Sequence, residues 1–266
     1  MTSASSTHLV VGASSGIGRS LALALAREGK HVALVGRSEE RLARVAREAA
    51  MFGGEPLALV SDVRDPISVQ AALAQIVLRG QRIETAILSQ GVGLGTDAEE
   101  FTSGALETML DINVLGVAHW LEALQPLLKA QPGEATVAVV SSLSADRAFP
   151  GASAGYSASK AAVSQLCDGL RAPWATQGIR LVTVAPGFVR TPMTAAQTWL
   201  PFLMEPEDAA RIILDGLRAG KSVVRFPRLA SLTMAAVRLL PPRLLDRLYR
   251  IPVGGSAAGT GGKKAA

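Results

Sequence analysis

Cysteine is almost absent from this chain of 266 residues, because Cys167 is the only one. One thiol cannot close a disulfide within its own chain, and no Cys or His spacing near it fits a zinc site, so no metal is expected. This suits a reducing compartment, and a cytoplasmic setting is predicted. The residues before His8 carry no Lys or Arg and no apolar segment. No run approaches the ~18 apolar residues of a membrane-spanning helix, so neither secretion nor a membrane span is expected.

Aromatic residues are scarce throughout the chain, and acidic residues are scarce in its C-terminal part. Aromatic residues make up 4% of the chain, so no stacking platform for single-stranded nucleic acid is indicated. Residues 221–266 hold nine of the 27 Lys and Arg but a single carboxylate, Asp246, and so carry +8, whereas residues 1–220 carry −3. The basic balance therefore predicts a local anionic partner or a solvated appendage, and no nucleic-acid partner.

Apolar residues make up 48% of the chain, which is enough for a large buried core. Short apolar runs alternate with longer helical patterns, without a fixed internal repeat, which is typical of βαβ units. Strands are predicted at residues 8–11, 31–35, 56–60, 85–88, 136–140, 181–185 and 222–226. Parallel neighbours need right-handed crossover helices, so the pattern predicts an α/β fold with a Rossmann-type doubly wound parallel sheet of about seven strands.

A glycine-rich turn joins the first predicted strand to the first predicted helix. Its glycines allow a tight turn and let backbone N–H groups at a helix N-terminus approach a pyrophosphate. A turn without a ligand is the alternative, but the position between first strand and first helix favours a dinucleotide. The residues predicted to contact it are Gly12, Ser14, Ser15, Gly16, Ile17 and Gly18.

The GxxxGxG spacing of this turn resembles that of the short-chain dehydrogenase/reductase family, and further motifs of that family follow in order. Asp62 and Val63 come after the third strand, and Asn113 lies in the run Asp-Ile-Asn-Val-Leu-Gly. Ser142 ends the fifth strand, Tyr-Ser-Ala-Ser-Lys occupies residues 156–160, and Pro186 with Gly187 ends the sixth strand. The resemblance covers nearly all of residues 8–227.

The resemblance implies a role for each matching residue. Ser142 would hydrogen-bond a substrate carbonyl, Tyr156 would transfer a proton, Lys160 would hold the nicotinamide ribose, and Asn113 would anchor a water chain that resupplies the proton. The other implied cofactor contacts are Asp62, Val63, Gly91, Pro186, Gly187, Val189 and Thr191, with Tyr156 and Lys160 contributing too. In this family the helices that carry Asn113 and Tyr156 often meet between subunits, so a homodimer or homotetramer is expected.

Tyr156 and Lys160 also make chemical sense by themselves. At positions i and i+4 of a helix they share a face, so the ammonium is expected to favour the ionised phenol, against an unperturbed pKa of about 10. Such a tyrosine can serve as a general acid or base. An ordinary surface pair is the alternative, and Ser142 at the carboxyl end of a strand favours the catalytic interpretation.

The end of the second predicted strand indicates which cofactor is used. An acidic side chain there would bind the ribose 2′-OH of NAD, but this chain has Arg37 and no carboxylate before Glu39. Arg37 can neutralise a 2′-phosphate, so NADP(H) is the predicted cofactor. The alternative is that Arg37 is a solvated arginine at a loop edge. The chain departs from the family pattern at Val11, where Thr is common, and at residues 88–91, Leu-Ser-Gln-Gly, where Asn-Asn-Ala-Gly is usual.

Residues 191–205, where the family carries a mobile substrate lid, are rich in apolar side chains. These favour a lipophilic substrate, and docking of the segment on the core is the equal alternative. They are Pro192, Met193, Trp199, Leu200, Pro201, Phe202, Leu203 and Met204.

The C-terminal part differs in character from the rest. Residues 1–227 are predicted to be the dinucleotide-binding and catalytic domain, 228–253 a basic amphipathic extension, and 254–266 a disordered tail rich in Gly, Ala and Lys. A helical stripe in the extension comprises Leu229, Leu232, Ala236, Leu239 and Leu240, with Arg228, Arg238, Arg243, Arg247 and Arg250 around it. Such an element can lie on an anionic membrane surface, or it can pack against the body or a partner subunit.

The sequence therefore predicts a cytoplasmic NADPH-dependent oxidoreductase. It would reduce a lipophilic ketone, or oxidise the corresponding secondary alcohol, of a 3-oxoacyl, sterol-like or long-chain-base type, with peripheral contact at the inner membrane surface as an open question. An epimerase or dehydratase is disfavoured because such relatives usually carry a larger substrate region. A non-catalytic NADP-binding redox sensor or regulatory protein on the same fold is the alternative, which the complete catalytic set disfavours.

Overall fold

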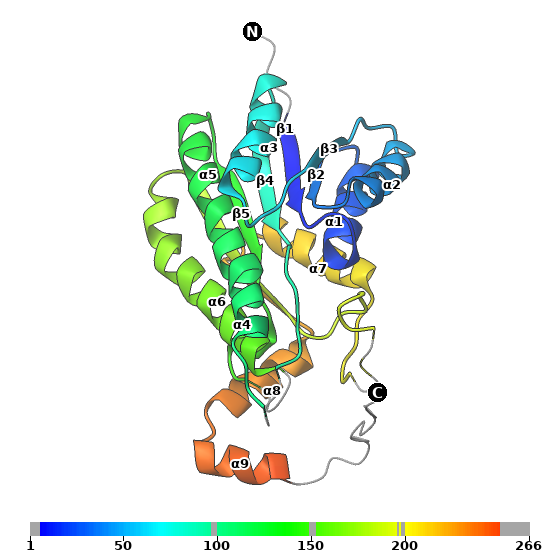
Figure 1. Ribbon diagram of the computed structural model, residues 1–266. Coiled ribbons are helices and arrows are strands. Elements are labelled where there is room, and N and C mark those ends of the chain that lie inside the picture. The colour runs from blue at the N-terminus through cyan, green and yellow to red at the C-terminus, as the bar shows by residue number, and fades with distance from the viewer. Residues whose placement is uncertain (1–5, 97–99, 149–152, 196, 198–199, 251–266) are drawn as a thin grey trace.

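A single parallel sheet organises the protein in a computed structural model that describes residues 6–96, 100–148, 153–195, 197 and 200–250. The strand order is β3-β2-β1-β4-β5-β6-β7, and every neighbouring pair is parallel. The predicted doubly wound α/β fold is therefore confirmed, with seven strands (Figure 1). They are β1 (Ser6–Val11), β2 (His31–Gly36), β3 (Leu57–Val60), β4 (Arg82–Leu88), β5 (Ala135–Val140), β6 (Ile179–Pro186) and β7 (Val223–Phe226).

Two layers of helices cover the sheet. Buried side chains from α1, α2 and α7 form one cluster with the sheet, and those from α3, α5 and α6 form another on the opposite face. The helices are α1 (Gly16–Arg27), α2 (Glu39–Ala50), α3 (Pro66–Leu78), α4 (Gly104–Leu110), α5 (Gly116–Ala130), α6 (Ala154–Ala175), α7 (Pro206–Arg218), α8 (Arg228–Arg238) and α9 (Pro242–Arg250). A π-helical turn, η1 (Asp111–Leu115), joins α4 to α5, and a 3-10 turn, η2 (Leu143–Ala145), follows β5.

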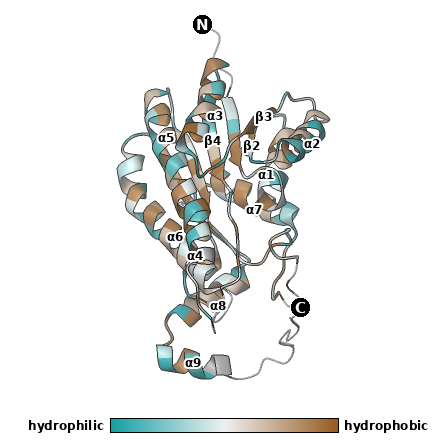
Figure 2. Ribbon diagram, viewed as in Figure 1, coloured by the Kyte–Doolittle hydropathy of each residue, from teal (hydrophilic) through white to brown (hydrophobic). Residues whose placement is uncertain are grey.

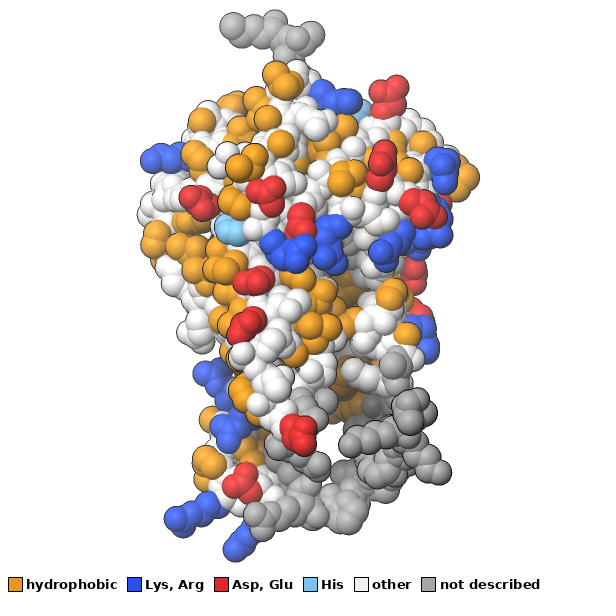
Figure 3. Space-filling model, viewed as in Figure 1, with side chains coloured by type: hydrophobic (Ala, Val, Ile, Leu, Met, Phe, Trp, Pro, Cys, Tyr) orange, Lys and Arg blue, Asp and Glu red, His pale blue; other side chains and the backbone are white. Residues whose placement is uncertain are grey.

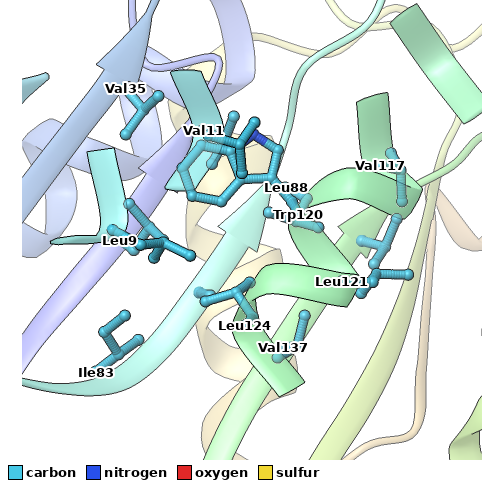
Figure 4. Close-up of a cluster of buried hydrophobic side chains, with 14 of the residues drawn as sticks. Leu9, Val11, Val35, Ile83, Leu88, Val117, Trp120, Leu121, Leu124 and Val137 are labelled. Atoms are coloured by element: carbon cyan, nitrogen blue, oxygen red, sulfur yellow. The ribbon is translucent and has the colours of Figure 1, made fainter. Parts of the chain in front are cut away.

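The strands are apolar throughout because both faces of the sheet are buried. Leu9 and Val11 of β1 belong to the cluster under α3, α5 and α6, whereas Val10 between them belongs to the cluster under α1, α2 and α7. Trp120 of α5 is fully buried and lies among side chains of β1, β4 and its own helix (Figure 4). Figure 2 shows largely apolar strands between helices on which polar and apolar residues alternate.

Local signals set where the helices begin. Ser38 caps α2 by accepting a hydrogen bond from the backbone N–H of Arg41 at 3.3 Å. Asp65 caps α3 by accepting from the N–H of Ile67 at 2.9 Å, and Pro66 occupies the first helical position, where its missing donor costs nothing. Both caps fix the direction in which the chain leaves the carboxyl edge of the sheet.

The C-terminal extension begins directly after β7. Its helices α8 and α9 form an arm at the end of the molecule opposite the N-terminus (Figure 1). The predicted boundary at residue 228 coincides with the first residue of α8. The predicted disordered tail, 254–266, lies outside the described residues.

Candidate active site

The predicted site residues gather at one edge of the sheet because all seven strands run in the same direction. The glycine-rich turn follows β1, Arg37 follows β2, Asp62 follows β3 and Ser142 follows β5. Tyr156 and Lys160 reach the same edge from α6. In an open parallel sheet, ligands bind outside the carboxyl ends of the strands, so this edge is the expected place for a cofactor and substrate.

The turn after β1 requires glycine at three positions. Gly12 and Gly16 have φ of +82° and +53°, in the left-handed region that other residues rarely adopt. A Cβ on Gly18 would lie 2.2 Å from the carbonyl oxygen of Gly12. The turn is anchored to β2 because the N–H groups of Gly12 and Ala13 donate to the carbonyl of Val35 at 2.9 and 3.0 Å.

The N-terminus of α1 fits a pyrophosphate. Ser15 at the N-cap position makes no side-chain capping bond, unlike the caps of α2 and α3. The first turn of α1 carries no acidic residue. The first N–H groups of a helix have no intrahelical acceptor, so those of Gly16, Ile17 and Gly18 can bind an anion at the positive end of the helix dipole. A dinucleotide pyrophosphate therefore fits the residues present here.

Arg37 is exposed at the end of β2 and has no ion-pair partner among the described residues. The carboxylate of Asp62, which Arg37 influences electrostatically, already pairs with Arg64 at 2.6 Å. The hydrogen bonds from Arg64 hold the pKa of that carboxyl below its usual value, with a smaller contribution from Arg37. Arg37 is therefore available to a phosphate. Val63 is buried against Gly116, and its carbonyl lies 2.9 Å from Nδ1 of His119, so its side chain serves packing.

Asn113 ties the loop after β4 to the helix that carries Tyr156. Its Oδ1 accepts from the N–H of Val92 at 2.8 Å, while its Nδ2 donates to the carbonyl of Val92 at 2.9 Å and to the hydroxyl of Ser159 at 3.0 Å. The side chain is fully buried on the π-helical turn η1. A Cβ on Gly91 would lie 3.3 Å from both Asn113 Oδ1 and Lys160 Nζ, so this glycine brings the two side chains close to the loop.

Ser142 and Tyr156 are brought together as predicted by the motifs. Ser142 accepts hydrogen bonds from the N–H and hydroxyl of Ser144 at 3.1 and 2.9 Å, which fixes its side chain at the start of η2. A hydrogen bond links it to Tyr156. The hydroxyl groups of Ser142 and Tyr156 are thus close enough to interact, and a carbonyl oxygen bound beside them could accept from both.

Burial opposes the ionised phenol that the spacing of Tyr156 and Lys160 predicts. Burial raises the pKa of Tyr156 to about 12, and the hydrogen bond with Ser142 lowers it only in part. Lys160 donates to the carbonyl of Val140 at 2.8 Å, its Nζ lies 5.9 Å from the centre of the Tyr156 ring, and burial lowers its own pKa to about 8. Tyr156 is consequently protonated at neutral pH and is suited to donate a proton.

The segment after β6 closes over this edge. Gly187, next to Pro186, donates to the carbonyl of Phe226 at 2.7 Å. Val189 is buried and forms a parallel β-bridge with Met204, so the two ends of the segment between them lie side by side. Thr191 reaches the glycine-rich turn, because a Cβ on Gly16 would lie 2.9 Å from its methyl carbon.

Met193 of the same segment lies near Tyr156. A Cβ on Gly93 would lie 3.1 Å from the Met193 sulfur and 3.6 Å from Cδ2 of Tyr156. One wall of the site is therefore apolar. Phe202 is partly exposed, and Trp199 lies outside the described residues.

The motifs did not predict several residues that shape the site. Ser144 and Ser159 hold Ser142 and Asn113, but short-range sequence patterns do not reveal such contacts. Arg64 pairs with Asp62, and its position two residues after that carboxylate could have indicated the ion pair from the sequence. Gln90, noted only as a departure from the family, is buried beside Gly12, and neither of its amide atoms has a partner among the described residues.

Comparisons with known proteins agree with this arrangement. The family model described as short chain dehydrogenase matches residues 6–199. An uncharacterized oxidoreductase from Myxococcus xanthus is 34% identical over 247 residues, covering 92% of this chain and 96% of that protein. The chain belongs to the short-chain dehydrogenase family, and it is an NAD(P)-dependent oxidoreductase.

Solved structures share the fold. A short-chain dehydrogenase/reductase from Burkholderia phymatum in complex with NAD superposes with a TM-score of 0.79 at 21% identity, covering 92% of this chain and 95% of that one. A short-chain dehydrogenase from Sphingobium yanoikuyae in complex with NADPH superposes with a TM-score of 0.76 at 26% identity, covering 95% and 98%. Relatives of this fold thus bind either dinucleotide.

Proposed function

We propose that the protein is an NADPH-dependent carbonyl reductase that acts on a lipophilic ketone. The observation that carries the proposal is the placement of Tyr156, with Ser142 and Lys160 close to it and the apolar Met193 beside its ring. A tyrosine whose pKa is about 12 holds its proton at neutral pH, which suits the reductive direction, in which a proton must be given to the developing alkoxide. Oxidation of the corresponding alcohol is the reverse reaction.

When bound, the dinucleotide supplies a hydride to the carbonyl carbon. Ser142 and Tyr156 both donate to the carbonyl oxygen, and Tyr156 passes its proton to that oxygen as negative charge develops there. The charge of Lys160, close to the Tyr156 ring, stabilises the phenolate that remains. Asn113 fixes the loop after β4 against α6, and in this proposal it also anchors the path by which the proton is resupplied.

Arg37 supports NADP(H) over NAD(H). It is exposed, has no ion-pair partner among the described residues, and stands where NAD-binding relatives would place a carboxylate. A guanidinium can form charge-assisted hydrogen bonds with a 2′-phosphate. The remaining proposed cofactor contacts are the glycine-rich turn, Gly91, and the residues from Pro186 to Thr191 that close over it.

The substrate class rests on the segment after β6. Its Met193 lies beside the site, and Phe202 and Leu203 are partly exposed on the same segment. Apolar side chains around one pair of hydroxyl donors suit a 3-oxoacyl, sterol-like or long-chain-base ketone. The proposed setting is cytoplasmic, and the proposed assembly is a homodimer or homotetramer through α5 and α6.

Kinetics with both dinucleotides test the proposal. Wild-type protein should oxidise NADPH in the presence of medium- and long-chain ketones, with kcat/KM for NADPH roughly 10- to 100-fold above that for NADH, because one charge-assisted contact contributes roughly 1.5–3 kcal/mol. The double variant Gly36→Asp with Arg37→Ala should reverse the preference, because a carboxylate repels the 2′-phosphate. A wild-type preference for NADH would overturn the assignment of Arg37. Tight NADPH binding without turnover on any ketone would instead favour a regulatory protein.

A further inference from the structure

The apolar stripe on α8 faces solvent. Leu229, Leu232 and Leu239 are exposed to 58, 69 and 84%. The opposite side of the helix faces the body, where Met234 is buried against Leu143 and Ala185. These three leucines therefore do not pack on the body, which leaves a membrane surface or a partner subunit as the alternatives for them.

Helix α8 is fixed to the body by polar contacts as well as by Met234. Arg225 of β7 donates to the hydroxyl of Ser231 on α8 at 2.9 Å and pairs with Asp146 next to η2. These contacts hold the buried side of α8 toward the body, so the leucine stripe stays on the outside. An exposed apolar stripe on an anchored helix indicates an interaction surface.

Positive charge surrounds this stripe. Arg228, Arg238, Arg243 and Arg247 are exposed, and none of them forms an ion pair within the described residues. Asp246 is the only acidic residue of the arm. Figure 3 shows basic and apolar side chains next to one another on the arm. The surface therefore combines leucines with unneutralised arginines, which suits a partner that is apolar inside and anionic outside.

We propose that α8 and α9 bind the surface of an anionic membrane, with Leu229, Leu232 and Leu239 entering the headgroup boundary and the arginines contacting lipid phosphates. Apolar insertion and attraction of basic residues to anionic lipid are the two contributions to interfacial binding. The attachment is peripheral: no described helix is long and apolar enough to cross a bilayer. A second copy of the chain fits less well, because a symmetric contact would place the two sets of arginines against each other.

The arm also lies close to the proposed chemistry. Met234 contacts Leu143, the neighbour of Ser142, and α8 lies at the end of the molecule toward which the strands run (Figure 1). Membrane binding would therefore hold the catalytic edge near the bilayer, the reservoir of a lipophilic ketone. This last step rests on the proposed function, whereas the membrane contact itself does not.

Vesicle flotation of the full-length protein tests the proposal without any turnover. Vesicles of phosphatidylcholine alone are compared with vesicles that contain phosphatidylglycerol, at low and high salt. The apolar variant is Leu229→Gln with Leu232→Gln, and its control is Ile67→Gln with Leu78→Gln, two side chains of α3 that are also largely exposed. The charge variant is Arg243→Gln with Arg247→Gln. Its control is Arg79→Gln with Lys129→Gln, two exposed residues directly after α3 and on α5.

Wild type and both control variants should float with the anionic vesicles at low salt and much less at high salt. The charge variant should bind about 30-fold more weakly at low salt, since each basic residue near an anionic surface contributes about 1 kcal/mol and 1.4 kcal/mol is tenfold. The apolar variant should lose at least about tenfold at every salt concentration. Thermal melting of each variant checks that it is folded.

Two results would overturn the proposal. One is failure of the wild type to bind anionic vesicles at low salt. The other is a loss of oligomer mass in the apolar variant, measured by light scattering, together with unchanged vesicle binding, which would make the stripe a subunit interface. Neither result depends on whether a ketone substrate has been found.

Discussion

Replacing Asn113 by Asp perturbs the network that joins the loop after β4 to α6 without changing its shape. The wild-type amide accepts one hydrogen bond from Val92 and donates one each to Val92 and Ser159, all between 2.8 and 3.0 Å. A carboxylate can accept from the Val92 N–H but cannot donate, so its second oxygen would face the Val92 carbonyl. The side chain is fully buried, and no water can relieve this repulsion.

The size of the effect depends on pH. Burial and the opposing carbonyl should raise the pKa of the introduced carboxyl by about 3 units, and each unit corresponds to about 1.4 kcal/mol, so the charged form should cost about 4 kcal/mol of unfolding free energy. When protonated, the carboxyl can again donate to Val92. Because the folded-state pKa is raised, stability should be retained below about pH 4 and lost as the pH rises through the folded-state pKa, near 7.

Urea unfolding followed by tryptophan fluorescence measures this dependence at about pH 5 and about pH 8. Asn113→Asp should lose stability relative to wild type as the pH rises. Asn113→Ala, which loses three hydrogen bonds worth about 1 kcal/mol each, should be about 3 kcal/mol less stable at both values. A parallel pH dependence for wild type and Asn113→Asp would refute the described network.

Three further predictions concern the groups around this network. The kcat/KM for ketone reduction should fall as the pH rises through about 8, because Lys160 then loses its charge, and the pH profile of Lys160→Met should lack that limb. Gly16→Ala should weaken NADPH binding in a fluorescence titration, since its Cβ would meet the Thr191 methyl, whereas Gly29→Ala, with a similar φ and open space around it, should leave binding unchanged. Gln90→Leu should raise the unfolding free energy by about 1–3 kcal/mol in urea, because neither amide atom has a partner within the described residues; a loss of stability would show that the amide is satisfied.

The fold could be predicted because its signals are local. Strands buried on both faces are short apolar runs in the sequence, and capping residues such as Ser38 mark where the helices between them begin. The ends of the strands were predicted less accurately: β4 begins at Arg82, three residues before the predicted start. Polar residues at a strand start are indistinguishable in sequence from loop residues.

The arrangement of the site was predictable only in part. Parallel strands bring their carboxyl ends to one edge, so the proximity of Ser142 and Tyr156 followed from topology. The pKa of Tyr156 did not, because it depends on how deeply the phenol is buried and on the direction of Lys160, which donates to Val140. In the same way the periodicity revealed the stripe on α8, and only the structure shows that Leu232 points outward.

Isotope transfer tests the central claim most directly. NADPH carrying deuterium at C4 of the nicotinamide, on the face from which the hydride leaves, is incubated with the protein and a lipophilic ketone, and the alcohol is analysed by mass spectrometry. The deuterium should appear on the carbinol carbon with the wild type and be lost with Tyr156→Phe, which should still bind NADPH. Deuterium transfer by Tyr156→Phe at the wild-type rate would contradict the role of Tyr156 as proton donor.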